Sequence, residues 1–149
     1  MKINIASNEV IHFIGIGGIG MSGLAQIMDN MGFKVQGSDL SSNKNTDRLI
    51  KSKIKVYFGH HQKNLKNTTM VVISSAIKKN NSELIKAKKK KLPIFKRGEM
   101  LANIVSLKKN IVIAGSHGKT TTTSLVGDIL LESGLDPTVI NGGIINSLK

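Results

Sequence analysis

The feature that most constrains the fold is a turn of two glycines, a lysine and four threonines, residues 115–123, between a β-branched run and a helical pattern. Residues 111–114 (Ile-Val-Ile-Ala) before it predict a buried parallel strand. Residues 124–133 after it carry apolar side chains at helical spacing: Leu125, Val126, Ile129 and Leu130. Strand, glycine turn and helix together are the setting of a phosphate-binding loop.

The residue types in this turn suit that chemistry. Gly115 and Gly118 let backbone amides face a phosphate without a Cβ between them, and the helix N-terminus adds positive partial charge. We expect Lys119 to reach the β- and γ-phosphates of a nucleotide and the Thr120 hydroxyl to bind Mg²⁺. The general pattern G-x-x-x-x-G-K-[ST] has a glycine where this chain has Ile113, so the loop is shorter than usual. The alternative is a glycine turn with a surface lysine.

A second glycine turn lies near the N-terminus. Residues 10–14 predict a buried strand, and the glycines that follow, Gly15, Gly17 and Gly20, satisfy G-x-G-x-x-G. The helical pattern after them consists of Leu24, Ile27, Met28 and Met31 and stops at Gly32. Asp39 follows a second strand, residues 33–37, near the spacing of the acidic residue that binds a ribose in dinucleotide sites. This pattern predicts a pyrophosphate site, with tight helix–strand packing and no ligand as the alternative.

Short helices and strands alternate between the two glycine turns. The expected strands are residues 55–58, 70–73 and 93–95, and the expected helices are residues 47–52, 80–91 and 100–107. The helix at 80–91 is predicted from the capping-box spacing of Asn80 and Glu83. Lysines 88–91 close it, where cations suit the negative end of the helix dipole.

Polar residues at the carboxyl ends of these strands are candidates for a ligand site, because open α/β sheets bind ligands at that edge. Ser74 and Ser75 follow the strand at 70–73, with ordinary turn chemistry as the alternative. Arg97 precedes a helix and either faces an anionic ligand or pairs with Glu99. His60, in the loop after residues 55–58, is a weaker candidate.

Composition limits the class of protein. The chain has 149 residues and no cysteine, which excludes disulfides, thiol catalysis and cysteine metal sites. No apolar run approaches the ~18 residues of a membrane span, and no secretory signal precedes residue 10. We therefore expect a cytoplasmic protein without a membrane partner.

The charge is unevenly divided along the chain. The net charge is +13, and residues 1–109 hold 20 of the 22 basic and 6 of the 9 acidic residues. Only Arg48 and Arg97 are arginines and aromatic residues make up 3%, so bidentate and stacking contacts to nucleic acid are scarce. We interpret the excess as a solvated lysine surface and expect no nucleic-acid partner, although it favours anionic ligands.

The C-terminal part predicts the beginning of a second unit. Residues 137–140 predict another strand, and residues 141–143 (Asn-Gly-Gly) a turn or ligand loop. The acidic residues after the lysine turn lie on or just after its helix, where none is placed to hold Mg²⁺ beside Thr120: Asp128, Glu132 and Asp136. About 40 residues are too few for a nucleotide-hydrolysing core, so we expect an N-terminal piece of a longer protein.

The two glycine turns in series resemble the Mur ligases of peptidoglycan synthesis. The resemblance covers essentially the whole chain and is carried by five motifs, at residues 15–23, 37–39, 74–77, 97–101 and 115–123. Two positions differ from the common family form: Ser116 stands where threonine is usual, and Gly98 where alanine is usual. The implied fold is α/β, with a Rossmann-like parallel-sheet domain (1–108) followed by the start of a P-loop-type ATP-binding domain (109–149).

The resemblance also implies a reaction. The first domain is expected to bind the UDP part of UDP-N-acetylmuramate, through Gly15, Gly17, Gly18, Gly20, Met21, Ser22, Asp39, Ser74, Ser75 and Arg97. The second is expected to bind ATP and Mg²⁺, through Gly115, Ser116, His117, Gly118, Lys119, Thr120 and Thr121, with Lys119 and Thr120 in catalysis and Thr120 on the metal. In this family the lactyl carboxylate becomes an acyl phosphate, which the amine of L-alanine attacks. The other metal ligands and a C-terminal domain are expected beyond Lys149, so the fragment alone is expected to be inactive.

Three rival interpretations remain open. A nicotinamide-dependent oxidoreductase explains residues 10–39 but gives residues 115–123 no role. A basic nucleic-acid-binding nucleotide hydrolase would use the lysines. Within the family, the ligase that recycles a tripeptide onto UDP-N-acetylmuramate shares the His-Gly-Lys-Thr loop, and residues 17–21 favour alanine addition instead.

Overall fold

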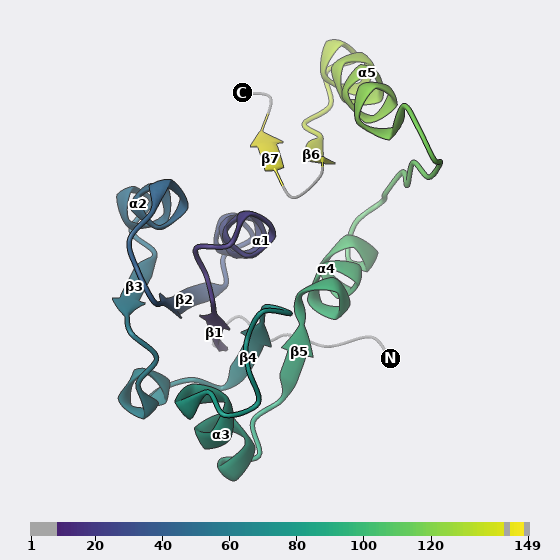
Figure 1. The fold of residues 1–149 in the computed structure, drawn as a ribbon. Helices are drawn as coiled ribbons and strands as arrows, with labels where there is room; N and C mark the ends of the chain where they lie inside the picture. Colours follow the sequence, from purple (N-terminus) through teal and green to yellow (C-terminus); the bar gives the residue numbers. More distant parts are fainter. Residues whose placement is uncertain (1–8, 142–143, 148–149) are drawn as a thin grey trace.

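The computed structural model describes residues 9–141 and 144–147 of the chain, and its main body is an open parallel sheet (Figure 1). The five strands are hydrogen-bonded in the order β3-β2-β1-β4-β5, and every neighbouring pair is parallel. Their bounds are β1 Val10–Ile14, β2 Lys34–Asp39, β3 Lys55–Phe58, β4 Met70–Ile73 and β5 Ile94–Lys96. The predicted α/β class with a parallel sheet is confirmed.

Helices cover both faces of the sheet. Their bounds are α1 Ile19–Asn30, α2 Lys44–Lys51, the 3₁₀ helix η1 Gln62–Leu65, α3 Ser82–Lys89, α4 Arg97–Ser106 and α5 Lys119–Glu132. One core cluster joins β1 and β2 to α1, α2 and α4, and includes Phe13, Met28 and Met100. A smaller cluster lies under α3 and η1 and includes Ile14, Leu65 and Leu84. Both faces are therefore buried, as a parallel sheet requires.

Three helices begin elsewhere than the sequence predicted, because their caps were not recognised. Asn43 accepts the amides of Asn45 and Thr46, so α2 starts at residue 44 rather than 47. Glu99 Oε2 accepts the amide of Lys96 at 2.8 Å, so α4 starts at Arg97 rather than 100.

The third of these helices, α3, is capped by Asn81 and not by Asn80. The Asn81 side chain accepts the amides of Glu83 and Leu84 at 3.0 and 3.1 Å. Glu83 is fully buried instead of reaching back to the cap, so the predicted capping box is wrong. Two residues after the ends of α2 and α3 stand lysines with positive φ, Lys53 at 64° and Lys91 at 54°.

The predicted strand at residues 111–114 does not form. Residues 107–118 have no helix or strand, and Ile111 and Val112 are 65% and 77% exposed. Among the described residues no other strand lies beside this segment, and a lone parallel strand leaves its backbone groups unpaired. Leu125 and Ile129 of α5 are also exposed, against the expectation that they face a core, and Gly127 is the buried residue of this helix.

The described C-terminal residues form α5 and an antiparallel hairpin of β6 (Thr138–Asn141) and β7 (Ile144–Ser147). The strand predicted at 137–140 is confirmed with a shift of one residue. Ile140 packs against the larger core cluster, and Figure 1 shows the hairpin above α1. Of the turn expected at 141–143, residues 142 and 143 lie outside the described residues.

Candidate nucleotide sites

The carboxyl edge of the sheet brings three of the predicted site segments together. The strand order reverses direction between β1 and β4, and ligands of open α/β sheets bind at such a switch point. The glycine turn follows β1, while Ser74 follows β4. A Cβ built on Gly15 would lie 3.3 Å from Ser74 Cβ, and Gly15 has φ of +83°. Glycine at this position therefore permits both the backbone conformation and the close approach of Ser74.

The end of β2 holds the glycine turn in place. The carbonyl oxygen of Ser38 accepts the amides of Gly15 (2.8 Å) and Ile16 (3.0 Å), and Asp39 Oδ2 accepts the amide of Gly17 (2.7 Å). Within the described residues no acceptor is found for the amides of Ile19 and Gly20, which begin α1. These two amides are the ones left to receive an anion at the helix N-terminus.

Arg97 lies over the beginning of α1. A Cβ built on Gly20 would lie 2.6 Å from Arg97 Nη1 and 3.1 Å from its Cδ and Cζ. Glu99 is occupied at the cap of α4, as described above. Of the two alternatives for Arg97, the described contacts show no pairing with Glu99, and its guanidinium lies beside Gly20 instead. Its contact with an anionic ligand stays a prediction.

The N-terminal end of α2 closes the opposite side of the turn. Asn45 Nδ2 donates to the carbonyl of Gly17 at 2.8 Å, and a Cβ at Gly17 would lie 2.6 Å from Asn43 Nδ2. Both oxygens of Asp39 accept backbone amides, those of Gly17 and Leu40 (2.8 Å). In this structure Asp39 therefore orders the turn, and its contact with a ribose stays a prediction.

The other predicted residues of this site differ in accessibility. Gly18 caps α1 and Ser75 is exposed at the end of β4. Met21 is buried in the core, and the Ser22 hydroxyl donates to the carbonyl of Ile19 at 3.0 Å. Met21 and Ser22 hold α1 in place here, and their direct contact with a ligand stays a prediction.

A buried polar cluster behind the turn was not predicted from the sequence. It consists of His12 (β1), Ser38 (β2), His60 (after β3), Asn64 (η1) and Glu83 (α3). Burial raises the pKa of Glu83, but the His12 imidazole and the hydrogen bonds from Ser38 and Asn64 outweigh it, so the pKa is lowered overall. The His60 imidazole points inward, with Nδ1 2.9 Å from Ser38 Oγ and 3.2 Å from Glu83 Oε2. The sequence spacing of Glu83 predicted a capping residue, so its inward orientation was not expected.

The second glycine turn lies at the start of α5. Gly118 caps the helix with φ of +76°, a conformation that favours glycine. Lys119 Nζ donates to the carbonyls of Gly115 (2.5 Å) and Ser116 (3.1 Å), so the lysine folds over its own loop. No acceptor is found within the described residues for the amides of Thr120 and Thr121. His117 is exposed with these residues at the surface.

The described residues contain no group of three or more His, Cys, Asp or Glu side chains placed to hold a metal ion. None of their helices has both the length and the apolar content needed to cross a membrane.

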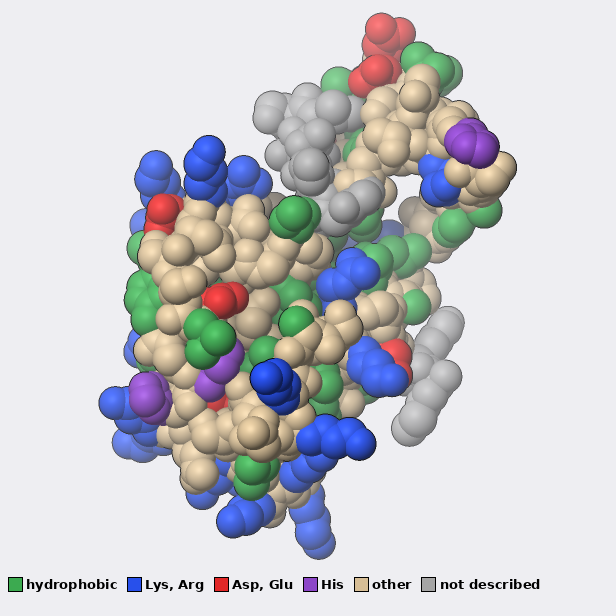
Figure 2. All heavy atoms as spheres, viewed as in Figure 1, with side chains coloured by type: hydrophobic (Ala, Val, Ile, Leu, Met, Phe, Trp, Pro, Cys, Tyr) green, Lys and Arg blue, Asp and Glu red, His purple; other side chains and the backbone are tan. Residues whose placement is uncertain are grey.

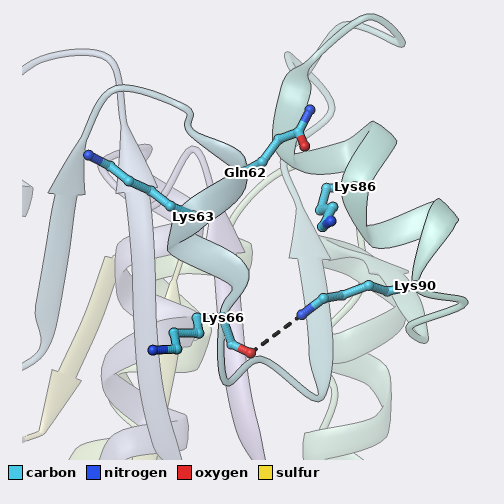
Figure 3. A pocket seen from close by; sticks show the side chains of 5 residues that line it. All are labelled: Gln62, Lys63, Lys66, Lys86 and Lys90. Atoms are coloured by element: carbon cyan, nitrogen blue, oxygen red, sulfur yellow. Dashed lines mark hydrogen bonds between the residues drawn. The ribbon is translucent and has the colours of Figure 1, made fainter.

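Lysines gather on the outer side of η1 and α3. A shallow groove of about 340 Å³ lies there, lined by Gln62, Lys63, Lys66, Lys86 and Lys90 (Figure 3). Lys90 Nζ donates to the carbonyl of Leu65 at 2.8 Å, so one of the four ammonium groups is used within the fold. Figure 2 shows further blue side chains around the rim of the larger part of the molecule, in line with the charge division in the sequence.

An open five-stranded parallel sheet, with a glycine turn at its switch point and a second glycine turn at the start of another helix, defines an α/β protein of the Rossmann-like type. The chain belongs to the Mur ligase family: residues 10–109 match the family described as "Mur ligase family, catalytic domain". The family inferred from the motifs is therefore confirmed.

Individual relatives agree with this assignment. The chain is 66% identical over 149 residues to a UDP-N-acetylmuramate–L-alanine ligase of Pelagibacter ubique, covering all of this chain and 32% of that protein. The crystal structure of UDP-N-acetylmuramate–alanine ligase from Thermotoga maritima superposes with a TM-score of 0.79 at 33% identity, over 89% of this chain and 31% of that one.

A tripeptide-adding relative is nearly as similar in structure. It is the UDP-N-acetylmuramate:L-alanyl-γ-D-glutamyl-meso-diaminopimelate ligase of Neisseria meningitidis, with a TM-score of 0.77 at 32% identity over 88% of this chain and 42% of that one. The chain spans about a third of the length of the curated relatives it matches.

Proposed function

We propose that this chain is the nucleotide-binding part of an ATP-dependent ligase that joins L-alanine to UDP-N-acetylmuramate in the cytoplasm. The observation that carries the proposal is the presence of two separate anion cradles, each at a helix start, in a chain 66% identical to a ligase of that name. We assign residues 1–108 to the UDP-sugar domain and residues 109–149 to the beginning of the ATP domain.

The first cradle suits the diphosphate of a UDP-sugar. The amides of Ile19 and Gly20, which have no acceptor among the described residues, and the guanidinium of Arg97 beside Gly20 lie together at the start of α1, at the switch point of the sheet. Amides at a helix start bind a phosphate oxygen without carrying a full charge, and arginine supplies a charged and bidentate donor. Ser74 and Ser75 stand beside this point as hydroxyl donors to the rest of the ligand.

The second cradle suits the phosphates of ATP. The Lys119 ammonium donates to two loop carbonyls, and in the proposed complex it would donate to phosphate oxygens in their place. The amides of Thr120 and Thr121 add neutral donors at the helix start. Exposed residues Ser116 and His117 complete the loop, and His117 is assigned a role in its shape or in substrate contact and not as a base.

The exposed Thr120 hydroxyl fits one position around Mg²⁺, because magnesium in nucleotide sites keeps waters and phosphate oxygens as its other ligands. The described residues offer no cluster of carboxylates there. When bound, ATP with Mg²⁺ would supply the phosphoryl group that turns the lactyl carboxylate into a good acyl donor for L-alanine. Lys119 would hold the phosphates and offset the negative charge that develops on the transferring group.

A second candidate is the ligase that adds a tripeptide to the same sugar nucleotide, because the structural match to such an enzyme is nearly as good. Both candidates require the first cradle to bind UDP-N-acetylmuramate. They differ in the amine substrate, which an activity assay of the whole protein with L-alanine or tripeptide separates.

Isothermal titration of UDP-N-acetylmuramate into the chain tests the proposal. Binding by the native chain and loss of binding by Gly17→Val are expected, because a side chain at residue 17 collides with Asn43, Asp39 and Thr46. Gly98→Ala is the matched control, since a Cβ there meets no atom within 4 Å. Binding of NADH without binding of the UDP-sugar would instead support an oxidoreductase.

A further inference from the structure

A carboxylate buried behind the glycine turn needs an explanation. Glu83 and His12 are fully buried, and a charged group inside a protein is costly unless several partners compensate it. The contacts of Glu83 reach four different elements of the fold, and one of them leads directly to the turn.

Each oxygen of the Glu83 carboxylate has its own partners. Oε2 accepts the Ser38 hydroxyl at 2.5 Å and lies 3.2 Å from His60 Nδ1. Oε1 accepts Asn64 Nδ2 at 2.7 Å and lies 3.4 Å from His12 Nε2, an ion-pair distance and not a well-formed hydrogen bond. The carboxylate therefore ties β1, β2, η1 and the loop after β3 to α3.

The loop that carries His60 is fastened by two more bonds. The Ser82 hydroxyl donates to the carbonyl of His60, and Asn64 Nδ2 donates to the carbonyl of Gly59 at 3.1 Å. His60 Nδ1 also lies 2.9 Å from Ser38 Oγ. The Ser38 side chain is thus held by Glu83 and by the imidazole of His60, whose loop is fixed by the two bonds described above.

Ser38 passes this restraint to the glycine turn. Its carbonyl accepts the amides of Gly15 and Ile16, and the next residue, Asp39, accepts the amide of Gly17. Three consecutive amides of the turn are therefore oriented by two consecutive residues of β2. The amides of Ile19 and Gly20 follow at the start of α1 and have no acceptor among the described residues.

We propose that Glu83 is a positioning residue for the sugar-nucleotide site: through Ser38 it fixes the glycine turn in the geometry that receives the diphosphate. The inference rests on the proposed function of the first cradle. Glu83 does not touch the ligand. Its replacement weakens binding because the loop amides lose their fixed direction, not because the protein loses a ligand contact.

Two measurements on three variants of the chain test this inference. The variants are Glu83→Gln, which keeps the size and one acceptor, Ser38→Ala, which removes the hydroxyl alone, and Leu65→Ala as control. Leu65, the last residue of η1, is fully buried in the smaller core cluster. Its truncation destabilises the same face of the sheet without removing a bond to Ser38.

The first measurement is amide hydrogen exchange by NMR without ligand. Glu83→Gln and Ser38→Ala are expected to speed exchange at Gly15, Ile16 and Gly17 by about fivefold or more relative to the strands. The second is titration with UDP-N-acetylmuramate, in which both variants are expected to bind about tenfold more weakly, the scale of one hydrogen bond. Leu65→Ala is expected to lower the melting temperature with neither change.

The outcomes separate this inference from the proposed function. If the native chain does not bind the UDP-sugar, the proposed function fails, while the exchange data still test the link from Glu83 to the turn. Native exchange at residues 15–17 in both variants overturns the inference. The same loss of affinity in Leu65→Ala also overturns it, because Glu83 would then act through global stability alone.

Discussion

Replacing Gly20 by alanine tests the arrangement of Arg97 over the beginning of α1. The new Cβ would lie 2.6 Å from Arg97 Nη1, and its three nearest neighbours all belong to that one flexible side chain. The guanidinium must therefore move, while the backbone need not. Alanine also has a better helix propensity than glycine, by up to about 1 kcal/mol, so the free energy of unfolding is expected to stay near its native value or rise.

The affinity for the UDP-sugar is expected to fall. A hydrogen bond between a charged donor and its acceptor contributes about 1.5–3 kcal/mol, which corresponds to a loss of about ten- to hundredfold in affinity. Titration of UDP-N-acetylmuramate and of UDP measures it, and both ligands should lose the same factor because they share the diphosphate. The loss should shrink at high salt, since a displaced charge acts through a screened field.

A double-mutant cycle identifies the cause. Arg97→Gln is expected to show the same loss, and the double variant with Gly20→Ala no further loss, because both changes remove the same contact. Gly98→Ala, one residue from Arg97, is the control. Native affinity in Gly20→Ala, or losses that add in the double variant, would contradict the assignment of Arg97 to the diphosphate.

Three further predictions follow from other residues. Gly98 lies inside α4 with no atom within 4 Å of a built Cβ, so Gly98→Ala should raise the free energy of unfolding by about 0.5–1 kcal/mol, measured by urea denaturation. Lys119→Met should weaken ATP binding by about tenfold or more and leave UDP-sugar affinity unchanged, because within the part of the chain that the structure describes Lys119 bonds to its own loop. A loss of affinity for both ligands in titrations would refute separate cradles. The pKa of Glu83 is lowered in the folded state from the ordinary 4.5. Its stabilising effect is therefore complete above that value and lost as pH falls below it toward the folded-state pKa. Denaturation curves of the native chain should show this acid loss, and those of Glu83→Gln should not.

Three strands of the first unit could be predicted closely from the sequence because each is a short, largely apolar run next to turn signals, whereas β2 (Lys34–Asp39) and β5 (Ile94–Lys96) are shifted from the predicted 33–37 and 93–95. Val10–Ile14, Lys55–Phe58 and Met70–Ile73 have the predicted bounds. The helix stop at Gly32 was also predictable, since its φ of +88° favours glycine. Local sequence signals were enough to locate these features.

The errors fall where tertiary contacts decide. Residues 111–114 have the composition of a strand, but a parallel strand forms only beside another strand, and none of the described residues provides one. Glu83 has the spacing of a capping residue, yet the polar groups of four other elements draw it inward. The gathering of the glycine turn, Ser74 and Arg97 was predictable only from the rule that parallel strands share a carboxyl edge.

The positive φ angles of Lys53 and Lys91 indicate from which end α2 and α3 unfold first. In a parallel α/β layer, helices start at the carboxyl edge of the sheet and finish at the amino edge, and α2 and α3 do so with asparagine caps at their starts. Lys53 and Lys91, at their far ends, hold a backbone conformation that costs about 1 kcal/mol for a residue with a side chain. Thermal fraying of α2 and α3 should therefore begin at their C-terminal ends, and their asparagine-capped starts at the carboxyl edge would be the last part of each helix to melt.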